Sequence, residues 1–353
     1  MGSLNGRHEA VIAVDAMGGD FAPEEVLKGA VQAHRRGIKV VIVGPVDTVE
    51  RHLEALGERL PVVNAEDAVP MDEPVAQALR RRESSLQVAA NLVLAGDADG
   101  VVSCGNSGAI MAITLTAWGR QPGIDRPAFG GNLPVRDGSA FVLDIGANTS
   151  SKASNLVQYA IMGDVYVRIA RGVDNPRVAL LSNGTEDSKG TKAVREANEA
   201  LQKLDLNFIG NIEGNQVFEG AADVVVTDGF TGNVLLKGSE GVAMEMLRLI
   251  RNELSSDVVA KLAGAVMMPA FQRVRRRVDF EEYGGVPVLG VDGVMINCHG
   301  RSTAKAVTNA ICLAERVVCE NLVDQIGEAL HHDGVERSNR RRRLARAFRL
   351  RHQ

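Results

Sequence analysis

Features that identify several common protein classes are missing from this sequence. Aromatic residues make up only 4% of the 353-residue chain, and no apolar run reaches the roughly 18 residues of a membrane-spanning helix. The cysteines show no CxxC spacing and no signal peptide precedes them. We therefore expect a reduced, cytoplasmic setting in which the cysteines are small buried residues. The four are Cys104, Cys298, Cys312 and Cys319.

The motifs of several enzyme families are absent as well. There is no Gly-x-Ser-x-Gly nucleophile elbow, and no Gly-x-Gly-x-x-Gly fingerprint follows the first predicted strand. The seven histidines are scattered, with no pair at the i, i+4 spacing of a helix-borne zinc site. We expect neither a metal nor a cofactor, because the aspartates at strand ends more often bond loop amides than Mg²⁺.

The charge is distributed unevenly. The chain carries −4 in total, but residues 337–353 contain eight arginines and no acid, which leaves −12 on the other 336 residues. An acidic body argues against binding of nucleic acid, whereas the basic tail suits any anionic surface.

The hydrophobic content of 45% is ample for a large core. Short β-branched runs alternate with long helical patterns, which predicts an α/β fold with a mostly parallel sheet covered by helices. The predicted strands are Ala10–Val14, Lys39–Val43, Pro61–Val63, Gly100–Ser103, Ala140–Asp144, Arg177–Leu181, Asn207–Ile209 and Asp223–Thr227, followed by a hairpin of Val286–Val291 and Gly293–Cys298. The predicted helices include Pro23–Arg36, Pro74–Leu94, Ala153–Arg171, Lys189–Leu204, Val234–Arg251 and Thr303–Leu330.

The only clear compositional break is the arginine tail. We expect a flexible N-terminus over residues 1–9, one α/β domain over residues 10–333 and a basic, disordered tail over residues 334–353. Residues 255–280 read as an amphipathic helical insertion within the domain.

Almost every predicted strand ends in a polar loop rich in glycine. Ligands of open parallel sheets bind at the carboxyl ends of the strands, so six such loops predict a crevice that binds a ligand. Glycines let the backbone approach the ligand, and free N–H groups at helix starts favour an anion. The loops are 15–20, 104–108, 144–148, 182–187, 228–233 and 297–302.

These loops carry the side chains of an oxyanion-binding site. Lys189, His299 and Arg301 are the candidate cations, although His299 also fits a role in loop packing and Lys189 could simply be solvated. Cys104 could act as a thiol nucleophile, but a small buried residue is the better interpretation. The hydrogen-bonding candidates are Asn106, Ser107, Asn148, Thr231, Asn233 and Ser302, and the acids are Asp15, Asp144 and Asp228.

Seven motifs in this order resemble bacterial phosphate acyltransferases of the PlsX family, over about Val11 to Leu330. They are VDAMGGDFAP, SCGNSGA, VLDIGAN, LLSNGTEDSKG, FIGNIEGNQVF, VVTDGFTGNVLLK and GVDGVMINCHGRS. The resemblance implies a three-layer αβα fold like that of isocitrate dehydrogenase and phosphotransacetylase, and a homodimer. It also implies that acyl-phosphate is made from acyl-(acyl carrier protein) and inorganic phosphate, and passed to a membrane glycerol-3-phosphate acyltransferase for phospholipid synthesis.

The sequence departs from the family pattern at two places. Many relatives carry an acid where this chain has Ser150, so no catalytic carboxylate is expected there. The common Lys-Gly pair before the late histidine is Asn297-Cys298 here, and Arg301 is the candidate to restore the lost charge.

The reaction that the resemblance implies needs positioning and charge stabilisation more than strong acid–base catalysis. We expect Lys189 and Asn233 to hold the phosphate and the developing charge, His299 to donate or relay a proton, and Asp228 to orient Lys189 or its own loop. The expected substrate-binding residues are Asp15, Gly18, Gly19, Gly105, Asn106, Ser107, Asn148, Thr231, Gly232, Arg301 and Ser302.

The segment Ser255–Val278 combines apolar residues at helical spacing with five basic residues and no acid between Val258 and Val278. It predicts two short amphipathic helices separated at Pro269, suited to peripheral membrane contact. A helical hairpin at the dimer interface is the alternative.

Three other functions fit parts of this pattern. A phosphotransacetylase-like enzyme would use acyl-coenzyme A in place of the carrier protein. An NAD-linked decarboxylating dehydrogenase has the same fold, but its metal triad and adenine-loop signals are missing. A non-catalytic scaffold for lipid synthesis would not need six polar strand-end loops.

Overall fold

The computed structural model describes residues 9–255, 258–277 and 284–331. The predicted basic tail, nearly all of the predicted flexible N-terminus and the last residues of the predicted insertion lie outside this part of the chain.

Eleven strands form one sheet, in the order β3-β2-β1-β4-β11-β10-β5-β6-β9-β7-β8. Seven of the neighbouring pairs are parallel and three are antiparallel, which confirms the predicted α/β class with a mostly parallel sheet. The strands are β1 Val11–Asp15, β2 Lys39–Gly44, β3 Val62–Asn64, β4 Gly100–Ser103, β5 Ala128–Val135, β6 Gly138–Leu143, β7 Val178–Leu181, β8 Phe208–Ile212, β9 Val224–Val226, β10 Val286–Leu289 and β11 Val294–Asn297.

The sheet has two sets of parallel strands that run in opposite directions. β3, β2, β1, β4 and β11 form the first set, and β6, β9, β7 and β8 form the second. Three antiparallel steps through β10 and β5 reverse the direction between them. The expectation that six loops leave one edge of a parallel sheet is therefore wrong, because these loops belong to two opposed sets of strands.

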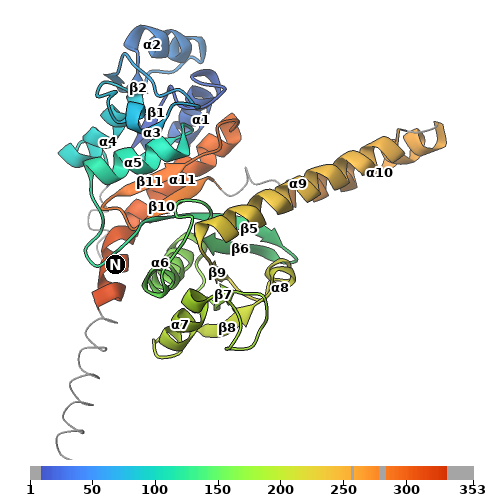
Figure 1. The fold of residues 1–353 in the computed structure, drawn as a ribbon. Coiled ribbons are helices and arrows are strands. Elements are labelled where there is room, and N and C mark those ends of the chain that lie inside the picture. The colour runs from blue at the N-terminus through green and yellow to red at the C-terminus, as the bar shows by residue number, and fades with distance from the viewer. Residues whose placement is uncertain (1–8, 256–257, 278–283, 332–353) are drawn as a thin grey trace, which may run out of the picture.

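Helices cover both faces of the sheet (Figure 1). Alternate strand residues explain the three layers: Ile12 and Val14 of β1 face one core cluster, and Ala13 faces the other. The helices are α1 Glu24–Arg35, α2 Val46–Ala55, α3 Val75–Ala78, α4 Ser85–Ala95, α5 Ser107–Ala117, α6 Ala153–Arg171, α7 Lys192–Leu201, α8 Gly214–Glu219, α9 Gly229–Glu253, α10 Val258–Arg277 and α11 Ala304–Cys319. Residues 322–330 are also helical.

All eight predicted single strands and the late hairpin are present. The predicted helix Pro74–Leu94 is two helices, α3 and α4, because Ser84 caps a new helix by accepting a hydrogen bond from Gln87 N–H. The predicted break at Pro269 is also wrong. α10 continues through Pro269, whose ring removes one backbone donor without ending the helix.

α9 and α10 form an arm that projects from the body of the molecule (Figure 1). α9 begins beside β5 and β6, near the place where the two sets of strands meet, and extends outward for 25 residues. The two helices also approach each other near Leu254 and Gly264.

The first turn of α9 lies directly against the end of β6. A Cβ atom at Gly232 would overlap the carbonyl oxygen of Asp144, and one at Gly229 would lie 2.7 Å from the Asp144 carboxylate. Glycine is therefore required at both positions, because any side chain would push the helix start away from the strand.

We predict that Gly232→Ala destabilises the protein by about 3 kcal/mol or more, since its methyl group meets backbone that has no room to move. Gly238→Ala is the matched control in the same helix, because no atom lies within 4 Å of the added Cβ. The control should gain about 0.5–1 kcal/mol from helix propensity. Denaturant unfolding of both variants checks this, and equal effects would contradict the packing argument.

Candidate active site

The strand-end loops form two clusters. The first loop cluster contains residues 15–19, 103–107 and 297–302, which follow the neighbouring strands β1, β4 and β11. The second loop cluster contains residues 144–148, 182–190 and 228–233, which follow β6, β7 and β9. Within the described residues, no hydrogen bond or ion pair links the predicted site residues of one cluster with those of the other.

Asp15 holds the first loop cluster together from inside. Its buried carboxylate accepts a 2.6 Å hydrogen bond from Ser103 Oγ, which in turn accepts one from Gly105 N–H at 3.0 Å. Burial raises the pKa of Asp15, and its hydrogen bonds oppose this rise. A Cβ at Gly18 would lie 2.7 Å from this carboxylate, so Gly18 serves close packing of the loops.

The start of α5 is the exposed part of this cluster. Asn106 caps the helix by accepting from Ala109 N–H at 3.1 Å, and its amide donates to the carbonyls of Met71 and Glu73. Ser107 is exposed at the first helical position. Both ends of the Asn106 amide are thus engaged within the protein, whereas Ser107 faces solvent.

His299 and Arg301 are both exposed beside this helix start. Arg301 N–H donates to His299 Nδ1 at 3.2 Å, so in the neutral ring the proton lies on Nε2. His299 therefore presents an N–H donor. Ser302, by contrast, is 5% exposed.

Asp144 organises the second loop cluster in the same way. Its carboxylate is fully buried and accepts from the N–H groups of Gly146, Ala147 and Asn148 at 2.8–3.0 Å. Burial raises the pKa of Asp144, and these hydrogen bonds counteract the rise. The Asn148 amide donates to Asp144, the Pro127 carbonyl and the Tyr159 hydroxyl, so its donors serve the loop.

The start of α9 exposes Thr231 and Asn233. Asp228 caps this helix, accepting from both Thr231 N–H and Thr231 Oγ at 2.9 Å. Asp228 thus orients its own helix turn, and the structure shows no ion pair between it and Lys189 within the described residues.

Lys189 lies in the loop that follows β7, next to the strand that leads to Asp228. Its side chain is exposed. A Cβ atom added at Gly184 would lie only 2.7 Å from the Cγ of Lys189. The glycine therefore leaves room for the aliphatic part of the Lys189 side chain, which carries the ammonium group at this edge of the cluster.

Cys104 is not suited to nucleophilic catalysis. It contacts the Cys298 thiol and is 3% exposed, and both the contact and the burial raise its pKa well above the ordinary thiol value. Cys104 and Cys298 are thus the small buried residues that were expected. The same expectation is wrong for the other two cysteines, because Cys312 is partly exposed and Cys319 is exposed.

A residue that the sequence analysis gave no role lies in the first cluster. Asn297 ends β11 and donates from Nδ2 to Ser107 Oγ at 2.8 Å. The parallel register of β11 with β4, which pairs Asn297 with Ser103, explains the contact. This register cannot be read from the sequence, because the two strands are almost 200 residues apart.

A family model described as fatty acid synthesis protein matches residues 10–325. The chain is 44% identical to the phosphate acyltransferase of Trichlorobacter lovleyi, covering 90% of this chain and 94% of that protein. It is also 44% identical to the phosphate acyltransferase of Heliobacterium modesticaldum, over 90% and 96% of the two chains. The chain belongs to the phosphate acyltransferase family. It is therefore an acyltransferase, as its resemblance predicts.

Solved structures confirm the predicted fold type. A phosphotransacetylase from Streptococcus pyogenes aligns with a TM-score of 0.61 at 18% identity, covering 89% of this chain and 94% of that one. The EutD phosphotransacetylase from Staphylococcus aureus aligns with a TM-score of 0.57 at 18% identity, covering 88% and 94%.

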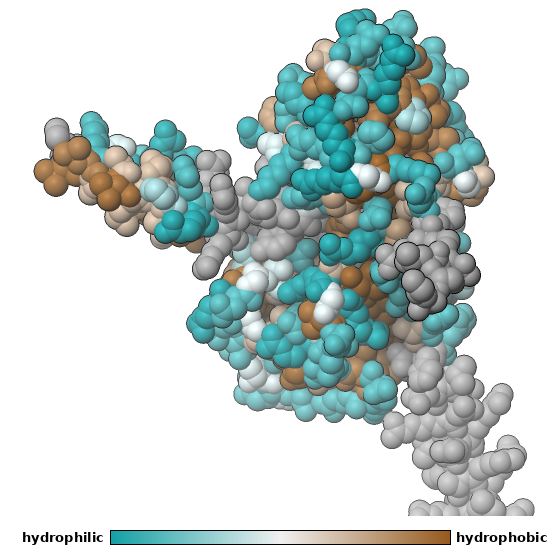
Figure 2. Space-filling view, turned by 180° about the vertical axis from the view of Figure 1, so that it is seen from behind, coloured by the Kyte–Doolittle hydropathy of each residue, from teal (hydrophilic) through white to brown (hydrophobic). Residues whose placement is uncertain are grey.

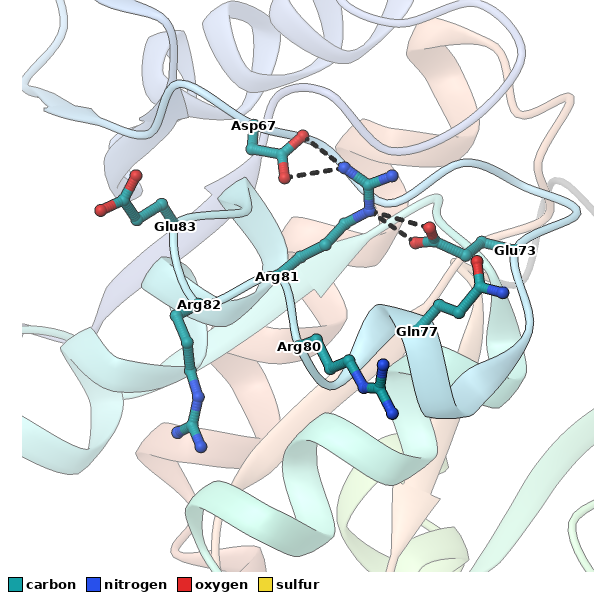
Figure 3. A pocket seen from close by; sticks show the side chains of 7 residues that line it. All are labelled: Asp67, Glu73, Gln77, Arg80, Arg81, Arg82 and Glu83. Carbon is teal, nitrogen blue, oxygen red and sulfur yellow. Dashed lines mark hydrogen bonds and ion pairs between the residues drawn. The ribbon is translucent and has the colours of Figure 1, made fainter.

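An open hollow of about 460 Å³ lies beside the α5 cap of this family member (Figure 3). Arg81 forms its wall, bonded to Asp67 at 2.8 Å and to Glu73 at 2.7 Å. Glu73 also supplies a carbonyl that binds Asn106. The Arg81 guanidinium therefore holds together the loop that contains Asp67 and Glu73 and that contacts the α5 cap. Arg80 and Arg82 point away from the ion-paired side chains (Figure 3).

We predict that Arg81→Met lowers the thermal midpoint of unfolding, because it leaves two carboxylates of the loop without their shared partner. Arg82→Met is the matched control: this neighbour is exposed and outside the ion-paired group. Thermal unfolding measures both, and a control as unstable as Arg81→Met would contradict a specific role for the ion pairs.

Proposed function

We propose that the protein transfers the acyl group of acyl-(acyl carrier protein) to inorganic phosphate. The acyl-phosphate product would feed phospholipid synthesis through a membrane glycerol-3-phosphate acyltransferase. Membership of the phosphate acyltransferase family supports the reaction, and the two exposed helix starts described above support its mechanism.

The observation that carries the mechanism is that α5 and α9 each begin in a strand-end loop with exposed hydroxyl or amide groups. The first N–H groups of a helix have no partner within it, and together with the helix dipole they bind anionic oxygens. Ser107 adds a side-chain donor at α5, and Thr231 and Asn233 are exposed at α9. At α9 the N–H groups of Gly229 and Thr231 already donate to Asn148 and Asp228, so this helix start would contribute mainly through the exposed side chain of Asn233.

In this reaction a phosphate oxygen attacks the thioester carbonyl, the C–O bond forms and the C–S bond breaks. The proton of monohydrogen phosphate ends on the departing thiolate, so the balance needs no other reactant. Lys189, the Asn233 side chain and the amides of residues 106–107 hold phosphate and the developing charge. The backbone donors expected at residues 105, 232 and 233 are excluded, because Gly105 N–H donates to Ser103 Oγ, Gly232 N–H donates to Asp228 O and Asn233 N–H lies within the hydrogen-bonded part of α9. His299, with Nε2–H available, donates to it or relays the proton.

The remaining predicted binding residues divide by exposure. Arg301 and Ser107 are exposed and suited to direct contact with an anionic substrate. Thr231 is also exposed, but its N–H and its hydroxyl both donate to Asp228, so its donors serve the loop. Asp15, Gly18, Gly19, Gly105, Asn106, Asn148, Gly232 and Ser302 shape the loops that carry these groups.

We predict that Lys189→Ala and Asn233→Ala each lower the rate of acyl-phosphate formation, by roughly 10²–10³-fold for the loss of one oxyanion donor. Lys192→Ala is the matched control, an exposed lysine three residues away that pairs with Glu196 at 3.8 Å. Near-normal rates for both site variants in folded protein would overturn these assignments.

The identity of the acyl donor separates this proposal from its closest alternative. A phosphotransacetylase-like enzyme would accept acyl-coenzyme A, so the two donors are compared with the same acyl chain and inorganic phosphate. Faster turnover of the carrier-protein donor supports the proposal. A preference for coenzyme A, or no product with either donor, contradicts it.

We also propose that the arm of α9 and α10 brings the enzyme to a membrane surface. Exposed apolar side chains gather near its outer end (Figure 2), and Val259, Leu262 and Val266 of α10 are 76%, 66% and 82% exposed. Lys261 and Arg273 add positive charge, whereas three arginines at the end of α10 have side chains outside the described part. No helix of the described residues is long and apolar enough to cross a bilayer. The apolar side chains of α9 nearer the body offer a surface for the expected homodimer.

We predict that Leu262→Asp with Val266→Asp abolishes binding to anionic vesicles, because two charges would have to enter the apolar part of the interface. Gln272→Asp is the control, an exposed polar residue of the same helix. Vesicle flotation measures binding, and equal flotation of the double variant and the control, or none by the unchanged protein, would reject the arm as the contact.

A further inference from the structure

The side-chain amide of Asn297 is buried, and its oxygen lacks a hydrogen-bond partner among the described residues. Asn297 is 6% exposed at the end of β11, and its Oδ1 finds no donor within the part of the chain that the structure describes. An unsatisfied buried acceptor destabilises a fold, and an apolar side chain of similar size would avoid this penalty. Stability alone therefore does not explain the amide.

Within the described residues, the other half of the amide makes one hydrogen bond, which reaches the candidate active site. Asn297 Nδ2 donates to Ser107 Oγ at 2.8 Å. A serine hydroxyl that accepts this hydrogen bond still has its own O–H hydrogen to donate. Since Ser107 is exposed, that hydrogen is available to a ligand outside the protein.

The surroundings of Ser107 show what the ligand would be. Ile110 N–H makes the first backbone hydrogen bond of α5, to Asn106 O at 2.9 Å, and Ala109 N–H is taken by the Asn106 side chain. The N–H groups of Ser107 and Gly108 precede these bonds at the positive end of an 11-residue helix. An outward Ser107 O–H joins them as a third donor, which is a set suited to an anionic oxygen.

We infer that Asn297 is a positioning residue for acyl transfer: by donating to Ser107 Oγ, it turns the Ser107 O–H toward the anionic oxygen bound at the start of α5. That oxygen belongs either to phosphate or to the thioester carbonyl as it becomes an oxyanion. This inference rests on the proposed function, because it concerns the same site.

A double-mutant cycle in the acyl-phosphate assay tests the link between the two residues. Ser107→Ala should slow the reaction by roughly 10²-fold, the loss of one oxyanion donor, and Asn297→Leu by about tenfold, because the hydroxyl remains but is free to turn. The double variant should be no slower than Ser107→Ala. If Asn297→Leu leaves the rate unchanged, or if the two losses multiply, the inference is wrong.

Stability separates positioning from a merely structural role. Asn198 of α7 is the matched control, a buried amide that donates to Asn211 Oδ1 at 3.1 Å and accepts from Gln202 at 2.7 Å. Asn198→Leu should lower the thermal midpoint and keep the rate of the folded protein, whereas Asn297→Leu should keep or raise the midpoint and lose rate. A midpoint for Asn297→Leu that falls as far as that of Asn198→Leu would overturn the inference.

Kinetic constants and direct binding identify the oxygen. A higher KM for phosphate in both Ser107→Ala and Asn297→Leu assigns the contact to phosphate, and a lower kcat with unchanged KM assigns it to the oxyanion. Calorimetric titration with inorganic phosphate needs no turnover. If the unchanged protein makes no acyl-phosphate, the proposed function fails and the role of Asn297 in acyl transfer fails with it. Weaker phosphate binding by both variants would then support only the hydrogen-bond link between Asn297 and a phosphate site at the start of α5, and equal binding would reject that link as well.

Discussion

The candidate active site depends on a buried carboxylate, that of Asp144, which fixes the loop of residues 144–148 through hydrogen bonds to its backbone. Asp144 directly follows β6 with no exposure to solvent, and three successive backbone N–H groups converge on it. A buried charge would be costly alone, but each hydrogen bond offsets part of that cost and fixes one residue of the loop. The Asn148 carbonyl held in this way accepts from Gly229 N–H at 2.8 Å, and this contact sets the position from which α9 begins.

A second buried carboxylate, that of Asp15 at the end of β1, holds the first loop cluster in the same way. Asp15 binds the end of β4 through Ser103, and α5 starts four residues later. The two buried aspartates determine the shape of the loops, whereas the starts of α5 and α9 that follow these loops are exposed. Acidic residues are thus compatible with the proposed anion site, because loop N–H and hydroxyl groups already bind their carboxylates within the protein.

Local pattern was sufficient for most of the fold, and long-range packing explains what it missed. β5 is absent from the predicted strands, and its Gly130, Gly131 and Pro134 are residues that disfavour a strand. The glycines are there because Phe141 and Ile145 lie where their side chains would be, a contact that only the folded sheet creates. The reversal between the two sets of strands was missed for a related reason, since β10 and β5 show their direction only through their partners. In the site, loop residues were identified by type, but which of them face inward depends on hydrogen bonds that composition does not encode.

Asn297 shows how such hydrogen bonds can matter more than charge. The resemblance described above implies a lysine there, and this chain, whose body is acidic, has the neutral amide of Asn297 instead. Lys189, His299 and Arg301 remain exposed at the two clusters, so attraction of an anion does not depend on position 297. What the amide provides is a hydrogen bond of fixed direction to Ser107, and fixed direction is what preorganised donors contribute. On the inference drawn above, this fixed dipole acts only over hydrogen-bonding distance and therefore depends on the close register of β4 and β11.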